Sequence, residues 1–371
     1  MTQRSFRAEA GRLLAAALAM TMTTTLGLGV AQAKDYILTA VKPDKLVVVD
    51  ADAMEIDRII QMDNAGPAPL TLVPTADGRA AYALVNRWES IVRVDLETGA
   101  ETLRINLSNG DTRVKAMFGL DLSPDGTTLA VFESPMQRLR AEYRVQPTRI
   151  SLYDAETGAL KARAEAPRQI TLLAYANDGT KLYGLGRALH IFDAATGEKI
   201  GEHATQGWDR ANFTPPDVLA VWSQWETAGV LSTPYYAART DTDPMAPETY
   251  WTGLLTLDLD SGDFRMVDVE NTDIFYFSSA VSPTNKDILY GAYTQLSKFD
   301  LAEGRALARV DLPHSYYAVN VSSDGRRVFV GGAMGDIAIY DAEDLTLLGR
   351  VDMPGGANMS LATLRVFQRE E

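Results

Sequence analysis

Side chains that could carry out covalent or metal chemistry are sparse in this sequence. It contains three histidines, His190, His203 and His314, and no cysteine. A catalytic triad or a three-histidine metal site requires such side chains to converge. The strand pattern instead places His190 within one strand, His203 at the end of another and His314 in a connection. Without cysteine the chain can hold neither a thiolate nucleophile nor a covalently attached haem. We therefore predict no catalytic residue and no metal site on this chain.

Large aromatic side chains gather in one stretch of the chain. Four of the five tryptophans lie between positions 208 and 251, and two of these, Trp222 and Trp225, fall in or beside an expected strand. The other candidates occupy expected loops or connections: Trp208, Arg210, Phe213, Tyr235, Tyr236, Tyr250, Trp251, His314 and Tyr316. Exposed rings are unfavourable unless something covers them. We assign these residues to a partner surface or a substrate pocket; packing of the long loops against one another is the alternative.

The elements that must position these residues follow a repeat. Residues 321–341 are typical of it: a strand, an Asp-Gly turn, a second strand, and a third strand that ends on aspartate. Aspartates in this position close seven expected third strands: Asp50, Asp95, Asp154, Asp193, Asp258, Asp300 and Asp341. They lie 39 to 65 residues apart, and a repeat of this length built from strands and turns indicates an all-β fold, a seven-bladed β-propeller. Since an aspartate can cap the backbone of the turn that follows it, we interpret all seven as structural.

The two ends of the chain fit closure of a ring. The first expected strands, Tyr36 to Ala40 and Leu46 to Asp50, leave the first blade without its innermost strand. Residues 359–367 alternate apolar and polar side chains in part, and they can supply that strand. We predict that this C-terminal strand completes the N-terminal blade, because closure removes the exposed edges of the array.

The lengths of the loops distinguish the two faces of the predicted disc. In a four-stranded meander, the loops between the second and third strands share one face with the connections between blades. We call this the crossing face, and the opposite one, which holds the tight turns, the turn face. Extra chain lies between second and third strands at residues 133–147 and 233–252. Both insertions are therefore expected on the crossing face, where binding loops would be carried by a rigid scaffold.

The first 33 residues resemble an export signal and not a part of the fold. Arginines precede an apolar run over residues 13–30, and Ala31-Gln32-Ala33 is typical of a cleavage site. We expect cleavage after Ala33, a propeller over residues 34–371, and a periplasmic protein without membrane insertion. A formal net charge of −14 disfavours binding to nucleic acid or to anionic membranes.

The sequence also resembles a known family. Residues 81–95 resemble the YVTN-type repeat of exported bacterial propellers, in which a strand ending at Asn86 leads to a second strand ending at Asp95. Over its whole length, with the leader, the seven aspartates and the tryptophan-rich fifth blade, the chain is similar to the β subunit of quinohemoprotein amine dehydrogenase. This resemblance implies a periplasmic heterotrimer. A small subunit carries cysteine tryptophylquinone, a dihaem cytochrome c subunit carries haem c, and the propeller carries no cofactor.

In that family the propeller holds the small subunit and helps to wall the site where primary amines are oxidatively deaminated. The resemblance therefore implies an oxidoreductase in which this chain is not active alone. Two other functions stay open. One is a lactonase-like hydrolase with a metal in the central channel, which needs carboxylates on the innermost strands, and the strands expected at 169–175 and 316–321 are poor in them. The other is a propeller that mediates adhesion or interaction without catalysis.

Overall fold

A computed structural model of the chain describes residues 33–219, 224–271, 274–361 and 363–370. The predicted export signal over residues 1–32 and Trp222 lie outside these ranges. Among the residues that are described, no helix is long and apolar enough to cross a membrane.

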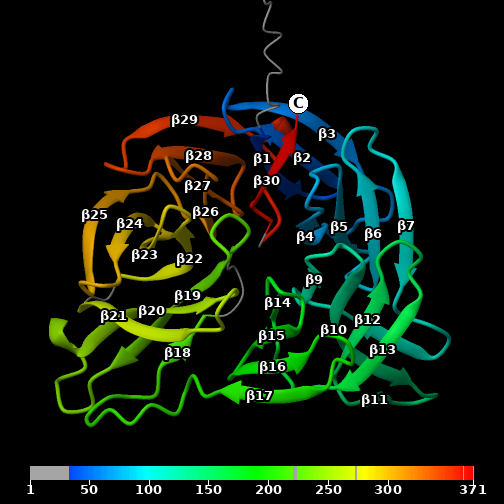
Figure 1. Cartoon of the computed structure of the whole chain (residues 1–371), viewed down its shortest axis with the longest axis horizontal. Coiled ribbons are helices and arrows are strands. Elements are labelled where there is room, and N and C mark those ends of the chain that lie inside the picture. Colours follow the sequence, from blue (N-terminus) through cyan, green and yellow to red (C-terminus); the bar gives the residue numbers. More distant parts are fainter. Residues whose placement is uncertain (1–32, 220–223, 272–273, 362, 371) are drawn as a thin grey trace, which may run out of the picture. The chain divides into compact units, whose positions relative to one another are not determined.

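Seven antiparallel sheets surround a central axis, which confirms the predicted seven-bladed propeller (Figure 1). Each blade has four main strands that follow one another from the axis to the outside. Blade 1 consists of β30 (Arg365–Glu370), β1 (Ala33–Val41), β2 (Lys45–Asp50) and β3 (Glu55–Gln61). Blade 2 consists of β4 (Leu70–Pro74), β5 (Ala80–Val85), β6 (Ser90–Asp95) and β7 (Glu101–Asn106). Blade 3 consists of β9 (Leu120–Leu122), β10 (Thr128–Arg138), β12 (Arg149–Asp154) and β13 (Leu160–Glu165).

Blade 4 consists of β14 (Leu172–Tyr175), β15 (Lys181–Leu185), β16 (Leu189–Asp193) and β17 (Lys199–His203). Blade 5 consists of β18 (Asp217–Val218), β19 (Val230–Ala238), β20 (Tyr250–Asp258) and β21 (Phe264–Asn271). Blade 6 consists of β22 (Tyr276–Ser282), β23 (Asn285–Tyr293), β24 (Gln295–Asp300) and β25 (Arg305–Asp311). Blade 7 consists of β26 (Ala318–Val321), β27 (Arg327–Gly331), β28 (Asp336–Asp341) and β29 (Leu347–Asp352).

Burial changes from the axis to the outside in the way that sheets packed face to face require. Every residue of β5, a second strand, is buried. The outermost strand β25 instead alternates exposed and half-buried side chains along its whole length. Inner strands therefore touch neighbouring blades on both faces, while outer strands present one row of side chains to solvent.

All seven register aspartates are the last residues of third strands, as predicted. Asp95 shows why. Its carboxylate accepts hydrogen bonds from the backbone N–H groups of Glu97 at 3.0 Å and Thr98 at 2.7 Å, and from the Thr98 hydroxyl. The turn then ends at Gly99, whose φ of 75° is unfavourable for other residues. These donors lower the pKa of Asp95 because they stabilise the anion.

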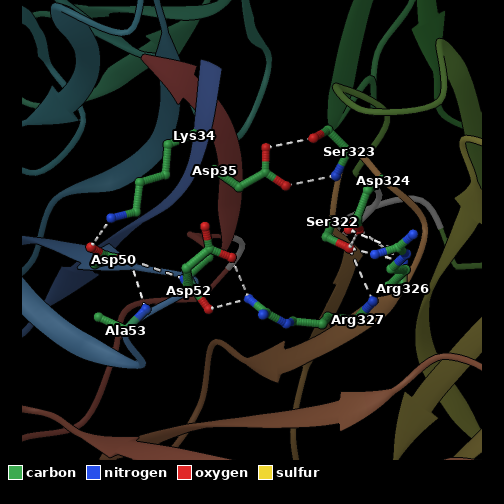
Figure 2. Close-up of polar contacts among 11 residues, drawn as sticks. Lys34, Asp35, Asp50, Asp52, Ala53, Ser322, Ser323, Asp324, Arg326 and Arg327 are labelled. Carbon is green, nitrogen blue, oxygen red and sulfur yellow. Dashed lines mark hydrogen bonds and ion pairs between the residues drawn. The ribbon is translucent and has the colours of Figure 1, made fainter. Parts of the chain in front are cut away.

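The ring closes through the C-terminal strand, which confirms the predicted closure. The bounds differ from the prediction: the strand is β30 over 365–370, paired with β1 from Ala33 to Leu38. Figure 2 shows polar contacts that hold this blade against blade 7: the Asp35 carboxylate accepts from the N–H and hydroxyl of Ser323 at 2.7 and 2.6 Å. Arg327 donates to the Asp52 carboxylate at 2.7 Å and to the carbonyl of Ala51 at 2.8 Å.

Both insertions extend strands of the propeller. In blade 3, β10 continues beyond the sheet and pairs there with two short strands, β8 (Thr112–Lys115) and β11 (Tyr143–Val145). In blade 5, β19 and β20 stay paired out to Ala238 and Tyr250. The loop that remains, residues 239–249, contains the 3-10 turn η1 (Pro247–Thr249); a second one, η2 (Pro354–Gly356), precedes β30. The irregular part of each insertion is therefore shorter than the sequence pattern suggested.

Candidate functional site

The aromatic residues predicted for blade 5 form one packed cluster. We call it the blade-5 cluster: Trp208, Arg210, Phe213, Tyr235 and Trp251. The Trp208 ring lies edge-on to Phe213 and Tyr235, with centroids 6.3 and 5.5 Å apart, and Phe213 lies 6.3 Å from Trp251. The Arg210 guanidinium lies over the rings of Trp208 and Phe213 at 4.4 and 4.0 Å. Packing of the long loops against one another, the alternative, therefore accounts for much of this region.

The carboxylate of Asp268 holds two members of this cluster, Arg210 and Tyr235. Arg210 pairs with Asp268 of β21 at 2.7 Å, and the Tyr235 hydroxyl donates to the same carboxylate at 2.6 Å. Burial and this hydrogen bond raise the pKa of Tyr235, because ionisation would place two anions together. The Trp208 indole N–H donates to the carbonyl of Thr214 at 2.9 Å. The hydrogen-bonding groups of these side chains are thus satisfied within the chain.

His314 and Tyr316 form a similar unit in blade 7. The Tyr316 hydroxyl donates to Asp336 at 2.7 Å, and the other oxygen of Asp336 lies 2.8 Å from His314 Nε2. The two rings are 4.2 Å apart. His314 lies in the connection between β25 and β26, as predicted, while His190 in β16 and His203 in β17 lie in another blade. The three histidines do not converge, and no group of three or more metal-ligating side chains occurs among the described residues.

A tyrosine hydroxyl bound to a carboxylate that also contacts a basic side chain recurs in other blades, which points to a structural role. In blade 3 the Tyr153 hydroxyl donates to Glu133 at 2.5 Å, and Arg149 pairs with that carboxylate at 2.6 Å. In blade 6 the Tyr276 hydroxyl donates at 2.9 Å to Glu270, which also pairs with Arg309. Tyr235 and Tyr316, predicted as contact residues, are 1% and 0% exposed. They lie beneath the surface and cannot touch a partner directly.

A continuous row of rings crosses blades 5, 6 and 7 on the crossing face. We call it the aromatic stripe: Tyr236, Phe275, Phe277, Tyr293 and Tyr317. Successive centroid distances are 4.6 Å for Tyr236 and Phe275, 5.1 Å for Phe275 and Phe277, and 4.5 Å for Phe277 and Tyr317. Tyr293 lies 4.5 Å from Phe277. Phe275 and Tyr317 lie in blade crossings, and Tyr236, Phe277 and Tyr293 lie in β19, β22 and β23 near the strand ends on the same side, so the stripe belongs to the crossing face.

A hollow opens between the blade-5 cluster and the aromatic stripe. Its volume is about 410 Å³, and its lining includes Tyr236, Tyr250, Trp251, Phe275 and Pro215. Tyr250 and Phe275 are 44% and 38% exposed. The Trp251 indole N–H is buried and has no acceptor among the described residues. A hollow with apolar walls and an unsatisfied donor suits an apolar group that carries a hydrogen-bond acceptor.

The nine predicted residues thus occupy different positions relative to this hollow. Tyr236, Tyr250 and Trp251 line the hollow. Trp208, Arg210 and Phe213 support it, and Tyr235 lies buried below. His314 and Tyr316 lie in blade 7, and Tyr316 directly precedes Tyr317 of the stripe. Phe275 also lines the hollow but is not one of the nine predicted residues, although its position in a blade crossing was a usable signal.

Sequence reasoning also missed a polar group in the central channel. Arg365 of β30 is buried; its guanidinium lies 2.8 Å from a carboxylate oxygen of Glu226, and it donates to the Gln224 amide oxygen at 2.9 Å. It also lies over the Trp225 ring at 4.6 Å. Blade 1 carries Arg365 and the segment leading into β19 of blade 5 carries the others, so these contacts cross the channel. An arginine within the expected closing strand, residues 359–367, was the signal available in the sequence.

Comparisons with known proteins bear on the fold. No family model matches the chain, and no curated protein matches it in sequence. Among solved structures, hydrazine synthase of Kuenenia stuttgartiensis is 14% identical, with a TM-score of 0.56 over 79% of this chain and 91% of that one. U3-55K is also 14% identical, with a TM-score of 0.53 over 81% and 85% of the two chains. Because 1533 solved chains match, the likeness is one of architecture, and the chain is similar to these proteins as a β-propeller.

Proposed function

We propose that this chain is a cofactor-free propeller subunit of a larger complex, and that it binds its partners through the crossing face. The observation that carries this proposal is the hollow with the aromatic stripe beside it. Exposed rings in a contiguous patch favour burial by another protein, and aromatic anchors in pockets supply most of the binding energy at interfaces. The insertion in blade 3 places Tyr143, which is 70% exposed, on the same face, so a partner could contact both insertions.

We further propose that the complex is a periplasmic quinohemoprotein amine dehydrogenase. The resemblance over the whole sequence supports this. The lack of cysteine is compatible with it, since cysteine tryptophylquinone and haem c would then belong to partner subunits. The small quinone-bearing subunit would sit on the crossing face beside the dihaem cytochrome c subunit. Tyr236, Tyr250, Trp251 and Phe275 would then exclude water from the neighbouring site and fit the apolar part of a primary amine.

The experiment is to express the chain with its genomic neighbours and to replace both Tyr250 and Phe275 by alanine. We expect co-purification of the small subunit to fall at least about tenfold, because two exposed anchors are lost, while the melting temperature stays the same. Ile200→Ala is the matched control, since Ile200 is 59% exposed on the outermost strand β17. Assembly and amine turnover unchanged in the double variant would contradict the proposal. A colourless monomer with hydrolase activity would support the lactonase-like alternative instead.

A further inference from the structure

A polar chamber opens on the turn face, opposite the proposed docking surface. Its volume is about 940 Å³, and it is lined by turns of blades 2, 3, 4 and 5 together with Arg365. This volume is within the range of pockets that bind small organic molecules. No residue of the blade-5 cluster or the aromatic stripe lines it. The function of this chamber is therefore a separate question from partner docking.

Charge in the chamber is strongly unbalanced. Six carboxylates line it, against two guanidinium groups: Asp77, Asp121, Asp125, Glu156, Glu226 and Asp260 face Arg93 and Arg365. Arg365 offsets these carboxylates only in part, because its guanidinium is paired with Glu226 and lies over the Trp225 ring. A chamber with excess negative charge concentrates cations from solution. No three of these carboxylates form a metal-ligating group among the described residues, so a bound metal ion is not the expected occupant.

Two buried side chains in the wall have unused bonding capacity. Asp121 of β9 is 6% exposed, and one of its oxygens accepts from the backbone N–H of Tyr175 at 2.8 Å. The backbone N–H of Leu122 and the charge of Arg365 also favour its ionised form, but no ion pair with Asp121 occurs among the described residues. Tyr175, at the end of β14, is 4% exposed, and its hydroxyl has no hydrogen-bond partner among the described residues. A buried carboxylate without an ion pair and a buried hydroxyl without a partner are both unfavourable until a ligand or water satisfies them.

We infer that this chamber binds an organic ammonium ion, with the ammonium group held between Asp121 and the Tyr175 hydroxyl. An ammonium group donates up to three hydrogen bonds, and both oxygens can accept. The ring of Trp225 and the apolar side chains of the wall would contact the body of the ligand. Burial raises the pKa of Asp121 to about 7, so the carboxylate is ionised and ready to pair above that pH. This inference does not depend on the proposed function, because the chamber opens on the other face.

The test uses the purified full chain and titration calorimetry at about pH 8 in low salt. The probes are 1-butylammonium, the dication of 1,4-diaminobutane, and 1-butanol as the uncharged analogue. We expect saturable binding of the two ammonium probes, tighter for the dication because more carboxylates line the chamber, and none of 1-butanol. Asp121→Asn should weaken binding at least about tenfold, since it removes a buried charge pair.

The matched control is Asp77→Asn, which removes a carboxylate from the same chamber. Asp77 lies in the turn between β4 and β5, where its carboxylate accepts from the Thr75 hydroxyl and the Arg79 N–H, and an asparagine oxygen can accept the same bonds. We expect this change to weaken binding less than about threefold. Tyr175→Phe removes only the unpartnered hydroxyl and should fold normally while weakening binding several-fold. No saturable binding of either ammonium probe would overturn the inference, since water alone would then occupy the chamber. Equal losses of affinity in Asp121→Asn and Asp77→Asn would also overturn it, since the overall negative charge of the chamber would then explain binding.

Discussion

At the scale of single residues, the buried tyrosine hydroxyls are the most informative feature of this propeller. Four of them, in blades 3, 5, 6 and 7, donate to a carboxylate that also contacts arginine or histidine. Charge-assisted hydrogen bonds of this kind are strong, and they satisfy groups that would otherwise be costly to bury. Aromatic residues near a functional face are therefore not all contact residues. In this chain the exposed rings of Tyr250 and Phe275 line the hollow, whereas the buried tyrosine hydroxyls bind buried carboxylates.

Glu133 provides the clearest test of this structural role. Its side chain is 1% exposed and holds Arg149 and the Tyr153 hydroxyl. Glu133→Ala should lower the free energy of unfolding by about 3 to 5 kcal/mol, because it leaves a half-buried arginine without its counter-ion. Urea denaturation measures this value. Glu142→Ala is the control: its ion pair with Arg144 is exposed and should contribute almost nothing. Equal denaturation midpoints for the two variants would contradict the role given to Glu133.

The raised pKa of Asp121 predicts an unusual pH dependence of stability. Burial raises this pKa from 3.8 to about 7, with Arg365 opposing and Glu226 reinforcing the effect. The folded state therefore binds more protons than the unfolded state between these values. The free energy of unfolding must then fall as pH rises across this window, by up to about 4 kcal/mol from this group alone.

Asp121→Asn should remove that slope, and urea unfolding at about pH 5 and about pH 7.5 would detect the change. Burial also disfavours the ionised form of Asp77, but hydrogen bonds from Thr75 and Arg79 outweigh burial and lower its pKa. The stability that ionised Asp77 contributes to the fold is therefore lost only below about pH 4. Asp77→Asn should leave the slope in the higher window unchanged. The same slope in wild type and Asp121→Asn would mean that Asp121 is ionised in the fold throughout.

At the scale of elements, closure of the ring depends on β30. It provides the innermost strand of blade 1 and carries Arg365 across the channel to blade 5. Removing residues 364–371 should unfold blade 1 and lower the melting temperature by more than about 10 °C, because an inner strand and a buried ion pair are lost together. Removing only residues 370–371 is the control and should have little effect. Circular dichroism on heating gives both values, and a truncated chain as stable as the control would refute this closure.

The sequence was sufficient for the elements but not for the direction of every side chain. The register aspartates could be located because each one caps a turn through its own carboxylate, as Asp95 does. The start of β30 at Arg365 could not be located, because the partial alternation over residues 359–367 begins before the strand does. Tyr235 and Tyr236 are adjacent, and strand alternation sends one between the blades and the other to the hollow. Without the register, the two tyrosines look equivalent.

The chamber was missed for a related reason. Asp121 lies between two leucines in an innermost strand, and its role depends on Tyr175 of the next blade and Arg365 of the closing strand. These residues are 54 and 244 positions away from Asp121 in the sequence. Only closure of the ring brings them to one cavity, so local patterns could not predict their meeting.

At the scale of the whole molecule, the two faces of the disc have different chemistry. The crossing face carries both insertions, the aromatic stripe and the apolar hollow. The turn face has short capped turns around the acidic chamber. The rigid ring keeps the two faces separate, so a partner protein and a small cation could be bound independently. We expect ammonium binding to be unchanged by Tyr250→Ala with Phe275→Ala, and calorimetry on that variant measures it.

We propose that this chain is the propeller subunit of a larger redox complex. The most direct measurement is purification of the tagged native chain from the periplasmic fraction of its own organism, with absorption spectra and intact masses of every subunit. The account predicts a stoichiometric complex with haem c absorption, a small subunit whose mass fits cysteine tryptophylquinone, and bleaching or reduction when a primary amine is added. A colourless chain that elutes as a monomer, or a chromophore covalently bound to this chain itself, would contradict it.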